Sequence, residues 1–283
     1  MIIRINGKKY RFTPNKNTLY SLCVFVLIIF FAFTLHSCTK YNRSIRGDKY
    51  EEVLVEYPVR ELRPCVAPDG TPTADYFSIY PPKANDKVIY LTFDDGPSPN
   101  VTPKILDVLK KYRVKATFFV VGYQAEKYPK ILERIGAEGH VIANHTYSHN
   151  YDSLYSSPEA LLDEINKTKD IIVSAAGESA YAGVLRFPGG AFKGQKEEFK
   201  EMLVQNQIPY CNWNCLNGDS ESTNPIASDL ISRAKRSSEK VSGTSLVMLM
   251  HDAGAKKATA DALPDIIEHF KSQGYRFDTI KRR

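Results

Sequence analysis

The chain has 283 residues, 43% of them hydrophobic and 25% charged, which excludes a disulfide-stapled miniprotein and suits one main domain with an appendage. Six of the 38 basic residues and none of the acidic ones lie in residues 1–40, so the net charge of +6 belongs to the N-terminus. The other 32 basic residues balance 32 acidic ones, and we therefore expect no nucleic-acid partner.

Residues 1–18 form a basic tail, and the apolar residues 19–36 that follow are just numerous enough to span a bilayer. Because the cations precede the apolar segment, we expect the tail in the cytoplasm and the rest of the chain outside, tethered to the cell membrane by a single-pass transmembrane helix. A cleaved signal peptide is an alternative, but no small-residue cleavage site stands out. The residues around Cys38 also resemble a lipoprotein processing box, so lipidation of Cys38 is a further alternative.

Residues 37–85 contain six prolines and no long periodic pattern, which indicates a stalk with at most a short hairpin.

Three of the five cysteines lie in the expected extracytoplasmic part: Cys65, Cys211 and Cys215. On one extended strand the Cα atoms of Cys211 and Cys215 would be about 13 Å apart, too far for a disulfide. We expect these two to be small buried hydrophobic residues, and the pairing of Cys65 with either stays open.

From residue 86 to residue 280, apolar runs rich in β-branched and aromatic residues alternate with amphipathic stretches of helical period. Thr102 and Ser157, each followed by proline, are expected to cap two of the helices. The alternation implies an α/β domain of parallel strands closed, or nearly closed, into a barrel; an open doubly wound sheet competes. The seven predicted strands are Val88–Phe93, Ala116–Val121, His140–Asn144, Val184–Phe187, Ile208–Cys215, Ser245–His251 and Tyr275–Thr279.

Two carboxylates, Asp94 and Asp95, follow directly on the first predicted strand. Alone they favour a turn that caps the next helix, although a bound cation is one way to keep two neighbouring carboxylates ionised. After the third predicted strand come His145 and His149, which on one helical turn would face the same point. Two histidines and one carboxylate are a familiar ligand set for a divalent cation and leave positions for water and substrate.

Three further predicted strands end in polar residues: Arg186 before Phe-Pro-Gly-Gly, Asp219 after Asn-Gly, and His251 before Asp. Taken singly, Arg186 could be a surface ion pair, Asp219 a turn residue and His251 a core histidine. All five segments end predicted strands, however, and the carboxyl ends of the strands meet at one end of a barrel. We therefore expect the five segments around a single mouth.

In this order the five segments resemble the five motifs of the polysaccharide deacetylase family with the NodB-homology domain, also called carbohydrate esterase family four. The resemblance covers roughly residues 86–280. It implies a distorted (β/α)7 barrel and a hydrolase that removes acetyl groups from N-acetylated sugars with one divalent metal ion. Zn²⁺ is the expected metal, with Co²⁺, Ni²⁺ and Mn²⁺ as alternatives.

Position by position, the resemblance implies that Asp94 is the catalytic base, which takes a proton from the attacking water. Asp95, His145 and His149 match the family's metal ligands. Arg186 matches the arginine that orients the base.

The resemblance also assigns the groups around the developing oxyanion and the leaving amine. The backbone N–H of Gly189 helps to bind the oxyanion, and Leu249 lines the pocket for the acetyl methyl group. His251 is the general acid, and Asp219 orients it and tunes its pKa. Thr146 stands where the family uses serine or threonine to steady the loop between the two histidine ligands.

Three positions depart from the family pattern. Ser220 replaces a usual tryptophan after the tuning carboxylate, Leu216 replaces a common acid, and Gly189 replaces a usual aromatic residue. The departures concern the walls of the sugar groove, and therefore substrate choice rather than metal chemistry.

A domain that faces outward meets the cell wall, so we expect a cell-wall glycan as substrate, and no protein partner is indicated. The expected sugar is the N-acetylglucosamine of peptidoglycan, with N-acetylmuramic acid or a chitin-like oligomer as alternatives. Three other functions compete: an inactive wall-binding module, an O-acetyl esterase acting on a xylan-like polymer, and a glycosidase with two carboxylates. An inactive module predicts loss of the base or of a ligand, and a glycosidase leaves the two histidines without a role.

Overall fold

The computed structural model describes residues 2–5, 8–11, 65–83, 85–192, 194 and 196–281. The chain divides into two units, Met1–Val59 and Arg60–Arg283. In the first unit, β1 (Ile2–Ile5) and β2 (Lys8–Arg11) pair in antiparallel fashion. The expected anchor at residues 19–36 lies outside the described residues, and none of the helices among those described has the length and hydrophobicity of a transmembrane span.

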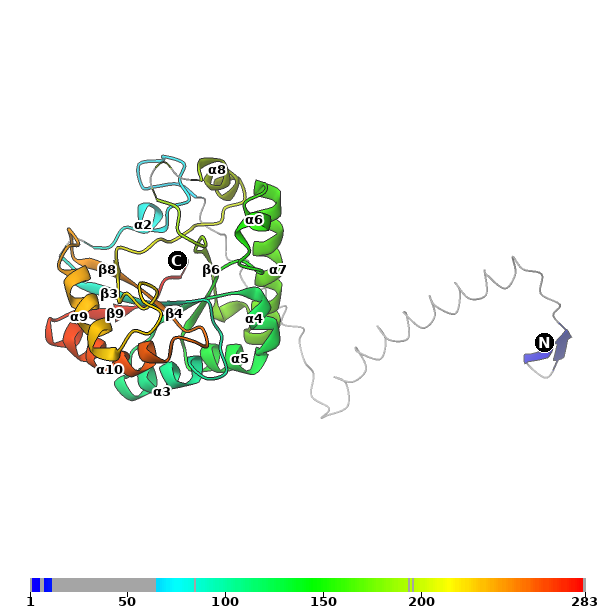
Figure 1. The fold of residues 1–283 in the computed structure, drawn as a ribbon. Helices are drawn as coiled ribbons and strands as arrows, with labels where there is room; N and C mark the ends of the chain where they lie inside the picture. Colours follow the sequence, from blue (N-terminus) through cyan, green and yellow to red (C-terminus); the bar gives the residue numbers. More distant parts are fainter. Residues whose placement is uncertain are drawn as a thin grey trace, which may run out of the picture. The chain divides into compact units, whose positions relative to one another are not determined.

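The second unit is built on a seven-stranded sheet in which every pairing is parallel (Figure 1). The strand order is β6-β5-β4-β3-β8-β7, and β9 pairs with the first half of β3. The parallel α/β class expected from the sequence is confirmed. The strands are β3 (Val88–Asp94), β4 (Thr117–Val120), β5 (Val141–Asn144), β6 (Tyr181–Leu185), β7 (Cys215–Leu216), β8 (Ser245–His251) and β9 (Arg276–Asp278).

Irregular backbone joins the two edges of this sheet. Leu185, the last residue of β6, donates its N–H to the Pro209 carbonyl at 2.9 Å and accepts the Cys211 N–H at 2.8 Å. A few residues later the same segment enters β7, which pairs with β8. The expected continuous strand Ile208–Cys215 is therefore wrong, because the segment changes partner midway and because Pro209 has no N–H for a ladder.

Most of the helices pack on the outer face of the sheet (Figure 1). Ser157 caps its helix as predicted, since its Oγ accepts the Ala160 N–H at 3.2 Å. Thr102 does not cap: it is the first helical residue, and its hydroxyl donates to Asp252 at 2.6 Å instead. The helices are α2 (Tyr76–Ile79), α3 (Thr102–Tyr112), α4 (Gly122–Lys127), α5 (Pro129–Ala137), α6 (Tyr151–Leu154), α7 (Pro158–Ala176), η1 (Glu178–Ala180), α8 (Glu197–Gln205), α9 (Ala227–Ser238) and α10 (Lys257–Ser272).

Alternation along β3 decides which of its side chains reach the site. Leu91 and Phe93 are buried against the helices, whereas Tyr90 belongs to the core on the inner face of the sheet. Thr92 and Asp94 continue the inner series, because successive side chains of a strand point to opposite faces. Asp94 therefore points inward at the carboxyl end of the strand.

Residues 65–83 belong to the second unit and pack against its sheet, although the sequence pattern predicted a stalk there. Tyr76, Ile79 and Tyr80 enter the inner core, and the Tyr76 hydroxyl donates to the Lys281 carbonyl at 2.8 Å. Tyr76 also donates its backbone N–H to the Tyr210 carbonyl at 2.8 Å. Aromatic side chains from outside the sheet thus fill the space that the short strands enclose, and the packed region begins before residue 86.

Cys211 and Cys215 are buried free thiols, as expected, so neither is bonded to Cys65. Burial raises the pKa of both thiols to about 12. Both are therefore protonated and inert near neutral pH.

Candidate active site

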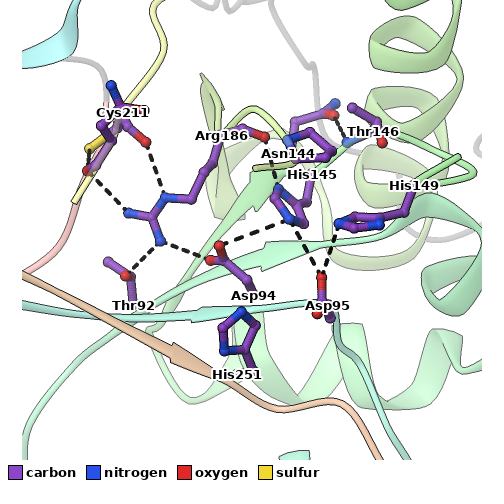
Figure 2. A network of polar contacts seen from close by, with 12 residues as sticks. Thr92, Asp94, Asp95, Asn144, His145, Thr146, His149, Arg186, Cys211 and His251 are labelled. Atoms are coloured by element: carbon purple, nitrogen blue, oxygen red, sulfur yellow. Dashed lines mark hydrogen bonds and ion pairs between the residues drawn. The ribbon is translucent and has the colours of Figure 1, made fainter. Parts of the chain in front are cut away.

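The predicted polar residues lie at the carboxyl ends of five strands. Figure 2 shows that those from β3, β5, β6 and β8 point toward one another. The residues are Asp94 and Asp95 after β3, His145 and His149 after β5, Arg186 after β6, Asp219 after β7, and His251 at the end of β8.

Asp95, His145 and His149 bring three ligand atoms within 4.8 Å of one another. Oδ1 of Asp95 is 3.5 Å from Nε2 of His145 and 3.4 Å from Nε2 of His149. Nδ1 of His145 lies 2.8 Å from the Arg186 carbonyl, which only accepts, so Nδ1 carries a proton and Nε2 is the ring nitrogen that a metal ion would bind. Two imidazole nitrogens and a carboxylate oxygen in this arrangement fit a divalent cation.

The three groups also perturb one another's protonation. Burial opposes ionisation of Asp95, but the hydrogen bond and charge of His145 outweigh it and hold the pKa of the carboxyl well below its usual value. Burial lowers the pKa of His149, and the neighbouring His145 lowers it further. Asp95 is therefore an anion and His149 favours its neutral form, which are the states that bind a metal. Burial lowers the pKa of His145, but the charge of Asp94 and the bond and charge of Asp95 outweigh this and raise it, so binding of a metal would release the Nε2 proton.

Three residues of the site adopt a left-handed backbone: Asp95 at φ +72°, Thr146 at +66° and His149 at +55°. Such a conformation costs a non-glycine residue on the order of 1 kcal/mol and is concentrated at functional sites. Asn144 stabilises this conformation at Thr146, because its Oδ1 accepts the Thr146 N–H at 2.9 Å while its Nδ2 donates to the Ile165 carbonyl at 2.9 Å.

The loop between the two histidines has a second anchor that the sequence reasoning missed. Glu164 of α7 accepts the N–H groups of Tyr147 at 2.8 Å and Ser148 at 2.7 Å. The Thr146 hydroxyl, by contrast, is buried and has no hydrogen-bond partner among the described residues. Thr146 steadies the loop through its backbone, since its carbonyl accepts the Gly122 N–H at 2.8 Å.

Asp94 is held by a fully buried arginine. Its Oδ1 accepts a hydrogen bond from Arg186 Nη1 at 2.8 Å, and its Oδ2 lies 3.9 Å from His145 Nε2. Arg186 Nη1 also donates to Thr92 at 2.7 Å, and its Nε donates to the Cys211 carbonyl at 3.0 Å. One oxygen of Asp94 is thus fixed by Arg186 while the other faces the candidate ligands (Figure 2).

His251 is the register partner of Asp94 across β3 and β8, so the two side chains lie on the same face of neighbouring strands. Its Nδ1 is 2.7 Å from Asp219 Oδ1, and its backbone N–H donates to Asp219 Oδ2 at 2.8 Å. Burial lowers the pKa of His251, but the hydrogen bond and negative charge of Asp219 outweigh this and raise it to about 9. The imidazole is therefore protonated near neutral pH.

Two residues that the sequence reasoning did not single out hold Asp219. Thr259 donates its hydroxyl to Oδ2 at 2.7 Å, and Lys256 donates to the backbone carbonyl at 2.8 Å. Both lie within eight residues of His251, at the start of α10. Asp219 thus accepts bonds from both His251 and Thr259, which fixes its orientation.

Asp252 is a fourth residue that the sequence reasoning missed. It is 1% exposed, its Oδ2 accepts the Thr102 hydroxyl at 2.6 Å, and its Oδ1 has no partner among the described residues. A Cβ built at Gly96 would lie 2.1 Å from the same carboxyl, so only glycine fits there. The sequence held one indication of a role for Asp252, namely its position directly after His251.

Gly189 lies in a tight turn at φ +72°, a conformation that suits glycine. The Pro188 carbonyl accepts hydrogen bonds from the Tyr155 hydroxyl at 2.7 Å and from the Lys196 ammonium at 3.2 Å, which anchors the turn. Leu249 is 7% exposed and lies two residues before His251, on the same face of β8.

Two positions that depart from the family pattern, Leu216 and Ser220, lie near the end of β7. Leu216, which stands where the family commonly has an acid, is the register partner of Leu249 and so places an apolar residue beside the expected pocket for the acetyl methyl group. Ser220 is exposed after the buried Asp219.

Residues 82–206, which include Asp94 through Arg186, match the sequence model of a family described as polysaccharide deacetylase. A peptidoglycan-N-acetylglucosamine deacetylase of Bacillus cereus is 33% identical over 202 residues, covering 69% of this chain and 87% of that protein. A peptidoglycan-N-acetylmuramic acid deacetylase of Bacillus subtilis is 35% identical over 198 residues, covering 70% of this chain and 39% of that protein.

Solved structures give the same result. A CE4 esterase of Streptococcus mutans matches with a TM-score of 0.64 and 36% identity, over 70% of this chain and 87% of that one. The catalytic domain of a peptidoglycan N-acetylglucosamine deacetylase from Eubacterium rectale matches with a TM-score of 0.62 and 30% identity, over 71% of this chain and 91% of that one.

Proposed function

Since this chain belongs to the polysaccharide deacetylase family and is therefore a hydrolase, we propose that it removes N-acetyl groups from a cell-wall polysaccharide, with the N-acetylglucosamine of peptidoglycan as substrate. The observation that carries the proposal is the meeting of Asp94 and His251 beside the cluster of Asp95, His145 and His149. A base, an acid and a cation site at one mouth are what amide hydrolysis needs.

Asp95, His145 and His149 would hold a divalent cation. We propose Zn²⁺ before Co²⁺, Ni²⁺ or Mn²⁺, because two imidazole nitrogens with one carboxylate oxygen suit it. When bound, such a cation supplies a Lewis acid that polarises the acetamide carbonyl and lowers the pKa of a water molecule.

Asp94 takes the proton of the attacking water. Arg186 keeps one carboxylate oxygen in place, so the other is free to accept that proton without reorientation. The Gly189 N–H, on its anchored turn, donates to the oxyanion that develops on the carbonyl. Removing one such donor from a hydrolase typically lowers turnover by about 10²–10³-fold.

His251 gives its proton to the departing sugar amine. Its Nδ1 is engaged by Asp219, so Nε2–H is the group that donates. The negative charge of Asp219 stabilises the imidazolium before transfer, and Leu249 packs against the acetyl methyl group. Acetate and the free amino sugar are the products.

The N-terminal sequence supports a location for this activity. We propose that residues 19–36 anchor the chain in the cell membrane, with residues 1–18 inside and the catalytic domain facing the wall. Fractionation of cells with external protease treatment tests this: the catalytic domain should sediment with membranes and be digested in intact, wall-stripped cells. A freely secreted product would refute the anchor, and a lipid found on Cys38 would establish the lipoprotein alternative.

Mass spectrometry of defined wall fragments after incubation with the metal-loaded protein tests the reaction and the sugar together. We expect the mass of one acetyl group to be lost from N-acetylglucosamine, and no loss with the Asp94→Asn variant. Loss from N-acetylmuramic acid alone would reassign the sugar. Release of acetate only from an O-acetylated xylan would replace the proposal by an esterase.

A further inference from the structure

Tyr151, the first residue of α6, is a large aromatic residue left half in solvent beside the candidate metal cluster. Its side chain is 48% exposed. Its ring meets the ring of His149 edge to face, with centroids 5.5 Å apart, and the ring of Tyr155 in the same way at 5.8 Å. An exposed ring in contact with a candidate ligand is available to whatever binds at that ligand.

The same ring lies against the turn that carries Gly189. A Cβ built on Gly189 would be 3.0 Å from the Tyr151 hydroxyl oxygen and 3.1 Å from its Cε1, so the phenol fills the space of a side chain at that position. Tyr151 therefore contacts both His149 and the turn that carries Gly189. A substrate whose acetyl carbonyl lies between the candidate cation site and that turn has the rest of its atoms near this ring.

The ring is held in place before any ligand arrives. Asn150 caps α6, since its Oδ1 accepts the N–H groups of Asp152 at 3.1 Å and Ser153 at 3.2 Å. Tyr155, on which the Tyr151 ring packs, donates its hydroxyl to Pro188 at 2.7 Å and so ties α6 to the turn. A rigid, preorganised aromatic side chain binds a ligand at low entropic cost.

We propose that Tyr151 contacts the substrate and determines specificity for a glycan, its exposed ring packing on the apolar face of the N-acetylated sugar and its hydroxyl meeting the polar rim. A pyranose has both surfaces, and tyrosine offers an apolar body with a polar tip. The inference rests on the proposed function, because it names the part of the site that recognises the sugar rather than the acetyl group.

Steady-state kinetics of Tyr151→Ala and Tyr151→Phe on two substrates tests the proposal. The tetramer of N-acetylglucosamine carries sugar rings, whereas 4-nitrophenyl acetate carries an acetyl group on a leaving group that is not a sugar. We expect Tyr151→Ala to raise KM for the tetramer about tenfold, the loss typical of a truncated aromatic contact, with kcat/KM for the ester changed less than about twofold. Tyr151→Phe should raise KM by about two- to tenfold if its hydroxyl makes one neutral hydrogen bond.

Tyr112→Phe is the matched control, because it removes a phenol hydroxyl that binds Glu268 at the far end of α3. Its KM for both substrates should equal that of the wild type. Metal content is measured for each variant, because Tyr151 also touches His149. Equal losses on both substrates together with loss of metal would show that Tyr151 only supports His149, and an unchanged KM for the tetramer would likewise overturn the proposal.

Binding separates this proposal from the proposed reaction. Calorimetric titration of the metal-loaded Asp94→Asn variant with the tetramer gives a Kd without turnover, and adding Tyr151→Ala should weaken it about tenfold. If the wild type released no acetate from the tetramer while this weakening was seen, the reaction would be wrong and the role of Tyr151 would stand. Absence of any binding to the tetramer would overturn the role of Tyr151 as well.

Discussion

Arg186 Nη1 donates to Asp94 Oδ1 at 2.8 Å, and neither residue is more than 2% exposed. The two residues are 92 positions apart and come from the ends of β6 and β3, so the bond spans the inner face of the sheet. A buried carboxylate without a counter-charge is costly. The arginine is therefore part of the fold as well as of the site.

Replacing Arg186 with methionine should lower the free energy of unfolding by about 3–5 kcal/mol, because it leaves the Asp94 charge buried and unpaired. Arg186→Lys keeps the charge, but an ammonium lacks the planar fork that reaches Thr92, Asp94 and Cys211 together. We expect this variant to fold with kcat lowered about 10–100-fold, the value of one hydrogen bond to a charged group. Urea unfolding and acetate release measure the two effects, and wild-type stability of Arg186→Met would contradict the first.

Asp219→Asn should move the alkaline limit of activity to lower pH. His251 acts in its protonated form, and its pKa is about 9 because the bond and charge of Asp219 outweigh the effect of burial. Activity should therefore be lost as pH rises through about 9 in the wild type. Without the negative charge, the pKa of His251 falls toward the ordinary 6.5, and the limit falls with it.

A profile of kcat against pH for both proteins measures this displacement. Thr259→Val is the control, because it removes one bond to Asp219 and keeps the charge, so its alkaline limit should move less. The stability of the fold should depend on pH in the same direction as activity. The raised pKa of His251 stabilises the folded state fully below about pH 6.5, and this stabilisation is lost as pH rises through about 9. Identical profiles for Asp219→Asn and the wild type would remove His251 as the acid.

Asp252→Asn should stabilise the metal-free protein more at alkaline than at acidic pH. Burial raises the pKa of Asp252 to about 7; the Thr102 bond opposes this, and the charges of Asp95 and Asp94 add to it. The native state therefore keeps a proton that the unfolded state, with a pKa of 3.8, has released. Stability of the wild type falls as pH rises from about 4 to about 7, whereas asparagine does not titrate.

Thermal denaturation of both proteins at about pH 5 and about pH 8 measures the effect, since most of the window of about 4 to 7 lies between these two values. The Tm of the variant relative to the wild type should be higher at the alkaline value. A pH-independent difference would show that Asp252 keeps an ordinary pKa.

The candidate site was predictable because its signals are local. An apolar run that ends in Asp94, His145 or His251 marks the end of a strand, and parallel strands bring their carboxyl ends together without further information. The tautomer of His145 was not predictable, because it depends on the Arg186 carbonyl, 41 residues away. Contacts of this kind require the fold.

The sequence predictions that were wrong failed for the same reason, because they concern residues whose contacts depend on the fold. Tyr76 and Tyr80 follow a proline-rich stretch with no period, so only the space inside the sheet explains their burial. Thr102 has the sequence of a cap, yet the buried Asp252 carboxyl takes its hydroxyl. Pro209 interrupts a run that otherwise has the composition of a strand.

Chelation should abolish turnover, and replacement of a ligand should abolish metal binding. Asp95, His145 and His149 supply all three candidate ligand atoms, so His149→Gln or Asp95→Asn leaves two. Metal affinity should fall by at least about 10–100-fold, the loss seen even for residues that only support a ligand. Asp94→Asn and His251→Ala should keep one metal ion per chain while losing turnover, because neither side chain belongs to the cluster.

Metal analysis after dialysis separates the two ligand variants from the two catalytic variants, and readdition of Zn²⁺ should restore turnover of the chelated wild type. Full activity after chelation, or equal metal content in all four variants, would show that the cluster is not the metal site.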